Sequence, residues 1–417
     1  MNDSTNVIDD LVTFKQWMDD EGIYLNPSLD IVKLEDYGRS IIANTLIKEG
    51  DVLIRVPRNV MMSRTGIELH IPKEIRSIID SNRDDIGSTD GQAVYLMYSL
   101  LNKDSYWHQY TSILPKQFTT SIYFDQDEMK ELQLSKLRYF TESRLSGIER
   151  HYNVIFKKLS SLNDEFKKKE YTFELFKWAL SCIWSRAFSL SSDDGGMVPL
   201  ADMFNAIEKA KSKVRPDSRA DQLIYYASKD IERGEQVFTP YGVYKTIGNA
   251  QMLMDYGFAF DDPSEGDTIQ LTLDNFSDDE LYIDTKIDLL EQLDIVREFN
   301  LKRNQLPQEL LIYARVKNLK ENELQLAKEH YRNDDNRNKP VSRRNEKTAL
   351  RYLSNYLSRY LDSYETTLSD DLELLEKNKE KKITLSYNML NIIRIRKGEK
   401  EILKQLIDSF DKIREHL

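Results

Sequence analysis

The sequence lacks the features of a disulfide-bonded, secreted or membrane protein. Its one cysteine, Cys182, excludes an intramolecular disulfide framework and any cysteine-rich zinc cluster. No apolar run approaches the roughly 18 residues of a membrane span, and the start, Met1-Asn2-Asp3-Ser4, is polar and acidic, unlike a signal peptide. We therefore expect a soluble protein of the cytosol or nucleus, with no membrane partner.

The chain also lacks an excess of basic residues. It has 59 Lys and Arg against 70 Asp and Glu, a formal net charge of -11. Nucleic-acid binding needs a basic face, so direct nucleic-acid binding is not expected. An acidic surface suits an enzyme whose partner is a basic protein, although many acidic proteins have no such partner.

Nucleotide-phosphate and metal motifs are missing as well. There is no P-loop and no G-x-G-x-x-G after a strand, so a Rossmann-type site is not supported. The five histidines are scattered, and none stands at ligand spacing from a carboxylate or the cysteine, so we predict no metal.

What is present is a mixed pattern in a chain long enough for two domains. Short strands are predicted at 31–34, 40–43 and 51–56, after a helix at 11–18, and residues 92–184 look mostly helical. Residues 223–227 and 231–238 read as a hairpin, and 208–221 as a surface loop. From residue 279 onward the pattern predicts helices at 281–299, 307–331, 346–375 and 385–413.

Two motifs with apolar flanks stand out, Met197–Asn205 and Asn249–Phe258. Neither contains a strong nucleophile, and neither has metal-ligand spacing. An Asn from one and a Tyr from the other could form a small polar site in apolar surroundings. This favours chemistry that positions a cofactor and a substrate.

These motifs resemble those of the SET-domain protein methyltransferases. The matching residues are D-x-x-N at 202–205, N-A-x-x-L-x-x-Y-G-F at 249–258, and Ser185-Arg186-Ala187-Phe188. The resemblance is to the branch that includes the Rubisco large-subunit and the fungal ribosomal-protein lysine methyltransferases. It implies an α+β fold: a SET domain of small twisted sheets over 1–275, with a helical insert at about 91–184, and a C-terminal helical substrate-binding domain over 276–417. The two motif segments would cross in a knot-like arrangement.

The resemblance also implies a site for S-adenosylmethionine and a protein substrate. Tyr256 and Tyr241 are the catalytic candidates. The cofactor-binding candidates are Gly38, Arg39, Ser40, Ser185, Arg186, Asp202, Asn205, Ala206 and Tyr256. Arg186, Phe188 and Tyr241 are the substrate-binding candidates.

The implied reaction moves a methyl group from a sulfonium to a lysine amine. A free lysine has a pKa near 10.4, so neutralising it at pH 7 costs about 4–5 kcal/mol. An apolar channel and the nearby sulfonium both lower that pKa. Tyr256 would then orient the amine or the methyl group without acting as a strong base.

Several alternatives stay open at this point. Ser40 replaces the second glycine of the family's Gly-x-Gly turn, and Ala206 replaces a usual histidine. The turn at Gly38 could be an ordinary β-turn. Asn205 and Asp202 could simply cap turns, and Arg186 could form a structural ion pair.

The predicted function is S-adenosylmethionine-dependent methylation of lysine in a non-histone protein, with a ribosomal or translation protein as the expected substrate. A protein-histidine methyltransferase and a non-catalytic binding module of SET type are the alternatives.

Overall fold

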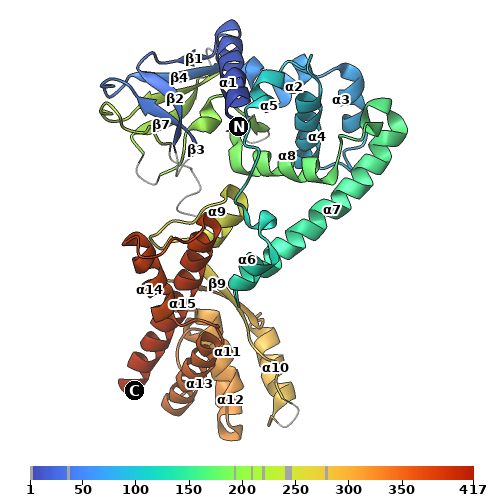
Figure 1. Ribbon diagram of the computed structural model, residues 1–417. Helices are drawn as coiled ribbons and strands as arrows, with labels where there is room; N and C mark the ends of the chain where they lie inside the picture. Colours follow the sequence, from blue (N-terminus) through green and yellow to red (C-terminus); the bar gives the residue numbers. More distant parts are fainter. Residues whose placement is uncertain are drawn as a thin grey trace. The chain divides into compact units, whose positions relative to one another are not determined.

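The structure is a computed structural model that describes residues 3–34, 38–191, 194–207, 210–217, 221–239, 247–277 and 280–417. Its contacts divide the chain into two compact units. The first comprises Met1–Thr120 and Ser143–Tyr244, and the second comprises Ser121–Glu142 and Lys245–Leu417. Small antiparallel sheets and many helices confirm the α+β prediction (Figure 1).

The described residues of the first unit form three small sheets. The largest has the order β1(Tyr24–Leu25), β4(Val52–Pro57), β8(Gln222–Ala227), β7(Ser212–Asp217); β2(Leu29–Leu34) pairs with β3(Gly38–Ala43), and β5(Ala187–Ser191) with β6(Asp194–Met197). The strands predicted at 31–34, 40–43 and 51–56 are confirmed as β2, β3 and β4. Gly50, at φ +91°, makes the turn before β4, where the left-handed backbone favours glycine.

The predicted hairpin of 223–227 with 231–238 is wrong. β8 pairs instead with β7, which lies inside the segment predicted to be a surface loop. β7 is an edge strand whose Lys213 and Arg215 are exposed, so its composition looks like that of a loop. Ile231 and Gln236 form isolated bridges to Ile47 and Ile42.

Helices make up the rest of the first unit. They are α1(Asp3–Asp20), α2(Arg64–His70), α3(Lys73–Asp80), α4(Ser88–Leu101), α5(His108–Ser112), α8(Phe173–Arg186) and most of α7(Lys136–Leu162), with 3₁₀ turns η1(Arg58–Val60), η3(Asp164–Lys167) and η4(Ala201–Met203). The predicted helix at 11–18 lies within α1, and the helical stretch 92–184 is confirmed. Trp107 is fully buried and donates to Val60 O at 2.9 Å, so it belongs to the core.

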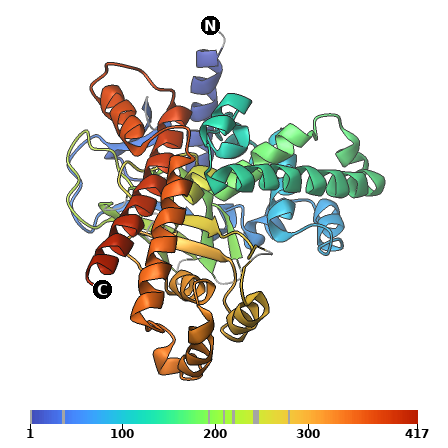
Figure 2. The ribbon, with the colours of Figure 1, turned by 90° about the horizontal axis from the view of Figure 1, so that it is seen from below.

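The second unit is mainly helical. It contains η2(Ser121–Tyr123), α6(Gln126–Glu131), α9(Asn249–Tyr256), α10(Ile283–Gln292), α11(Gln308–Lys317), α12(Glu321–His330), η5(Asp334–Asn336), α13(Arg343–Asp362), α14(Leu368–Lys379) and α15(Tyr387–Glu415). α13 and α15 lie side by side (Figure 2). Leu350, Leu353, Leu403 and Phe410 on these two helices are almost fully buried in the core of the unit. No helix among the described residues is long and apolar enough to cross a membrane.

Three of the four C-terminal helix predictions need correction. The segment 281–299 contains α10 and then the start of β10(Glu298–Lys302), which pairs with β9(Thr268–Thr272). In β10 Phe299 and Leu301 are buried between exposed neighbours, a period of two. The segments 307–331 and 346–375 are each two helices; Thr367 caps α14 by accepting from Asp370 N at 3.1 Å. The helix predicted at 385–413 is confirmed as α15.

The compact units do not follow the predicted boundary at residue 275. α9 packs within the second unit, because Leu253 and Met254 share an apolar cluster with Ile392 and Ile395 of α15. The domain limits 1–275 and 276–417, and the knot-like crossing of the two motifs, stay predictions.

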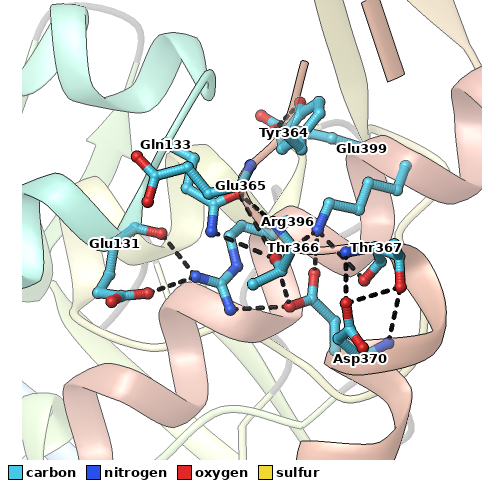
Figure 3. A network of polar contacts seen from close by, with 11 residues as sticks. Glu131, Gln133, Tyr364, Glu365, Thr366, Thr367, Asp370, Arg396 and Glu399 are labelled. Atoms are coloured by element: carbon cyan, nitrogen blue, oxygen red, sulfur yellow. Dashed lines mark hydrogen bonds and ion pairs between the residues drawn. The ribbon is translucent and has the colours of Figure 1, made fainter. Parts of the chain in front are cut away.

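Buried charges tie the helices of the second unit together (Figure 3). Asp371 on α14 is fully buried and binds two cations of α15: Lys400 Nζ at 2.6 Å and Arg396 at 2.7 Å. Arg396 also binds Glu131 Oε2 of α6 at 2.6 Å. Buried ions are tolerated only when paired and hydrogen-bonded, so these contacts fix α6 and α14 against α15.

Glu399, one residue before Lys400, is a second buried carboxyl in this region. It accepts hydrogen bonds from Ser135 Oγ at 2.6 Å and Tyr364 OH at 2.9 Å. Burial raises the pKa of Glu399 to about 7, although these two hydroxyls act in the opposite direction. Repulsion by Asp267 contributes to this rise in the pKa, and the nearby Lys400 opposes it.

Glu399 makes the stability of the second unit depend on pH. Between about pH 4.5 and 7 the folded state holds a proton that the unfolded state has lost, so the free energy of unfolding falls as pH rises through this window. The total loss is on the order of 3 kcal/mol, at about 1.4 kcal/mol per pKa unit. Glu399→Gln should abolish this part of the pH dependence.

Urea unfolding of the full chain at pH 5 and pH 8 measures the effect. The exposed Glu415→Gln is the matched control and should follow the wild type. If the free energy of unfolding falls by the same amount between pH 5 and pH 8 in Glu399→Gln and in the wild type, Glu399 is not the source of the pH dependence.

Candidate active site

The polar site in the first unit is built where β3 meets the motif that ends at Asn205. Gly38 opens β3 at φ +66°, and an added Cβ there would meet no atom within 4 Å, so space lies beside it. Asn205 Nδ2 donates to Ser40 Oγ at 2.9 Å and to Arg39 O at 3.3 Å. The structure thus brings together four residues predicted as cofactor-binding: Gly38, Arg39, Ser40 and Asn205.

The local backbone explains how Asn205 reaches this position. Leu200, fully buried, has φ +68° and starts η4, which turns the chain out of β6. Asn205 O then accepts from Thr239 N at 2.9 Å, and Ile207 N donates to Thr239 O at 3.2 Å. Ala206, the half-buried residue between Asn205 and Ile207, takes no part in either hydrogen bond with its own backbone N–H. A backbone contact of Ala206 with the cofactor stays a prediction.

Asp202, three residues before Asn205, has a buried carboxylate. It accepts from Tyr110 OH at 3.0 Å and from Arg186 at 3.3 Å, and Arg186 also donates to Asp202 O at 2.8 Å. Burial raises the pKa of Asp202, and Arg186 and Tyr110 lower it. Asp202 and Arg186 form an ion pair that orders the motif, which was the structural alternative for Arg186.

Two other predicted residues lie apart from these contacts. Ser185 donates to Ser181 O at 2.7 Å, within its own helix α8. Phe188 is half-buried in β5, opposite Gly196 of β6. The roles predicted for them stay predictions, and Tyr241 lies outside the described residues.

The second motif belongs to the second unit. Asn249, the first residue of α9, holds the chain on both sides of the helix. Its backbone N donates to Asp267 Oδ1 at 2.6 Å, and its side-chain Oδ1 accepts from Phe260 N at 2.8 Å. Gly257 ends α9 at φ +83°, a left-handed cap that favours glycine. These contacts set the position of Tyr256, the last residue of α9.

Tyr256 is half-buried, with its ring 6.4 Å from that of Phe258. Burial and the neighbouring Asp255 raise the pKa of Tyr256 above its ordinary value of 10.0. Its hydroxyl is therefore neutral near pH 7 and can orient a partner as hydrogen-bond donor or acceptor. Whether Asn205 and Tyr256 serve one site stays a prediction.

Sequence reasoning did not single out Gln236 and Thr239 of the first unit as site residues, and it favoured a core position for Tyr110 over one that faces a ligand. Gln236 Nε2 donates to Ser40 Oγ at 3.2 Å. Gln236 falls in the segment 231–238 predicted as half of a hairpin, Thr239 follows it directly, and their links to β3 and Asn205 are long-range. Tyr110 reads as a core aromatic, and only its hydrogen bond to Asp202 reveals its part.

Family models match most of the chain. A SET-domain model matches residues 38–242, and a Rubisco LSMT substrate-binding model matches residues 277–403. The chain belongs to the SET-domain methyltransferases.

Individual relatives agree with this assignment. A tobacco (Nicotiana tabacum) ribulose-1,5-bisphosphate carboxylase/oxygenase large-subunit N-methyltransferase is 28% identical over 95% of this chain and 81% of its own. The human actin-histidine N-methyltransferase is 27% identical over 94% of this chain and 67% of its own.

Solved structures share the fold. The LSMT SET domain bound to lysine and AdoHcy has a TM-score of 0.76 at 24% identity, covering 97% of this chain and 91% of the other. Rubisco LSMT bound to AdoMet has a TM-score of 0.75 at 24% identity, covering 98% and 92%.

The residues around Asn205 fit a zwitterionic ligand. Among the described residues none donates to Asn205 Oδ1, so this carbonyl can accept from an ammonium. Asn205 is half-buried, and Gly38, in the strand that Asn205 contacts, has no atom within 4 Å of the place where a Cβ would stand. The amino-acid end of S-adenosylmethionine carries an ammonium that can donate to this carbonyl.

Asn205→Ala should weaken S-adenosylmethionine binding by about 1–3 kcal/mol, because it strips hydrogen bonds from a buried zwitterion. Isothermal calorimetry of the full chain measures the change. Asn322→Ala, at an exposed site of the second unit, is the matched control. Unchanged affinity in Asn205→Ala would move the cofactor site elsewhere.

Tyr256→Phe should remove most methyl transfer and leave cofactor affinity nearly intact. Losing one positioned polar contact at a reacting centre costs roughly 10²–10³ in rate. Single-turnover assays with labelled cofactor measure the rate, with Tyr139→Phe, 63% exposed, as control. Near-normal turnover in Tyr256→Phe would sink the catalytic assignment.

Proposed function

We propose that this chain is a protein-lysine N-methyltransferase that uses S-adenosylmethionine and acts on a basic non-histone protein. The observation that carries the proposal is the arrangement of the Asn205 carboxamide. Its amino group donates to Arg39 O and Ser40 Oγ of β3, and none of the described residues donates to its carbonyl. This arrangement stands in a SET domain that is followed by a substrate-binding domain.

In this proposal one residue binds the cofactor and another orients the target nitrogen. When bound, the cofactor supplies a methyl group on a sulfonium. Asn205 would hold the amino-acid end of the cofactor, and Tyr256 would orient the target nitrogen with a neutral hydroxyl. A target lysine must lose its proton before it can attack; burial in an apolar setting lowers its pKa toward neutrality.

Methylation of histidine is the second candidate. The observation in its favour is that actin-histidine N-methyltransferases match 94% or more of this chain at a similar identity. An imidazole has an ordinary pKa near 6.5 and is largely neutral above pH 7, so it needs less help from the site.

For the substrate we propose a ribosomal or translation protein of the cytosol or nucleus. The net charge of -11 favours a cationic partner at long range. The motif Met197–Asn205 also resembles the fungal ribosomal-protein group. Methyl transfer from labelled cofactor into an extract lacking this protein, followed by mass spectrometry of the labelled band, identifies both substrate and residue.

The pH dependence of the reaction separates the two target residues. For lysine, kcat/KM should rise up to about tenfold per pH unit from pH 7 to 9, because the free amine, with a pKa near 10.4, must lose its proton. For histidine, the profile should be nearly flat above about pH 7.5. Rates from pH 6.5 to 9 on the labelled substrate measure this. A flat profile with the methyl group on imidazole would replace the lysine proposal with the histidine one.

A further inference from the structure

We infer that Ser40 is a positioning residue, whose hydroxyl orients the Asn205 carboxamide so that the carbonyl faces the ligand. This inference rests on the proposed function, because it concerns the ammonium group of S-adenosylmethionine. It assigns a role to a residue that departs from the glycine of the related turn.

The orientation of the Asn205 amide follows from its two acceptors. Arg39 O, at 3.3 Å from Nδ2, can only accept a hydrogen bond. A flipped amide would place Oδ1 against this carbonyl oxygen, and the two would repel. The amino group therefore faces β3, and Oδ1 points away from it.

The hydroxyl of Ser40 reinforces this choice. Asn205 Nδ2 at 2.9 Å and Gln236 Nε2 at 3.2 Å both donate to Ser40 Oγ. The one proton of the hydroxyl goes to Gly38 O at 3.3 Å. Ser40 is fully buried, so no water competes for these bonds. The hydroxyl is left as an acceptor for Asn205, and it holds the amino group at the shorter of its two distances.

The backbone tolerates serine here at no cost. The left-handed conformation is at Gly38, with φ +66°, and Ser40 does not have a positive φ. Ser40 lies inside β3, paired with Val32 of β2. The side chain thus adds a hydrogen-bond acceptor beneath Asn205 without strain, and glycine in its place would leave the amide with Arg39 O alone.

The consequence is selective for one part of the ligand. An outward carbonyl accepts from an ammonium, whereas an outward amino group would not. Ser40→Ala should therefore weaken the binding of S-adenosylhomocysteine, which carries the amino-acid end, by about tenfold in Kd. The same substitution should leave the Kd for 5′-methylthioadenosine, which lacks that end, within about twofold of the wild-type value.

Calorimetry of the full chain with both ligands tests this. Ser81→Ala, at an exposed serine of the first unit outside the site, is the matched control and should keep near wild-type affinity for both ligands. In an Asn205→Ala background, Ser40→Ala should cause no further loss, because the two residues act as one unit. If Ser40→Ala does not fold, judged by its melting curve, Ser40→Gly replaces it with the same expected loss.

Each outcome decides the matter. Equal loss for both ligands, no loss for either, or additive losses in the double variant would overturn the role of Ser40. The proposed function is tested apart from it: wild type that binds neither ligand would refute the cofactor assignment, and weakened binding in Asn205→Ala alone would leave the assignment standing without Ser40.

Discussion

The buried carboxylate of Asp202 is the constraint on which the first unit's site depends. A charge taken out of water must be paired, and Asp202 obtains its partners from two separate helices: Tyr110 of α5 and Arg186 at the end of α8. These contacts tie both helices to η4. Asn205, three residues later, is placed as a result, and its amide meets β3 at Arg39 and Ser40.

The second unit uses the same principle at two places. Asp371, fully buried, binds Lys400 and Arg396 and so connects α14 with α15. Asp267 accepts from the backbone of Asn249 and Ser264, and so closes the loop behind α9. Because Tyr256 is the last residue of α9, the position of the proposed catalytic hydroxyl depends on buried hydrogen bonds and not on the helix alone.

The residue proposed for cofactor binding in the first unit and the residue proposed for catalysis in the second unit are both neutral. Asn205 and Tyr256 carry no charge near pH 7, since burial raises the pKa of the tyrosine further above neutrality. This suits a reaction in which a cationic cofactor meets a nitrogen nucleophile, because a fixed charge beside either partner would bind it too strongly or repel it. The charged residues, Asp202 and Arg186, neutralise one another below the site.

Local sequence alone determined much of this protein. Period and composition predicted β2, β3, β4 and α15, because buried alternation and helical repeats are local properties. The spacing of the motifs at 202–205 and 249–258 predicted the SET family, which the family models confirm. Tertiary structure decided what depends on partners distant in sequence. β7 reads as a loop until β8 pairs with it, and β10 reads as helix until β9 does. The consequence of serine at position 40 could not be read from the turn either, because its hydroxyl acquires its function only where Asn205, 165 residues later, supplies an amide that needs an acceptor in a place closed to water.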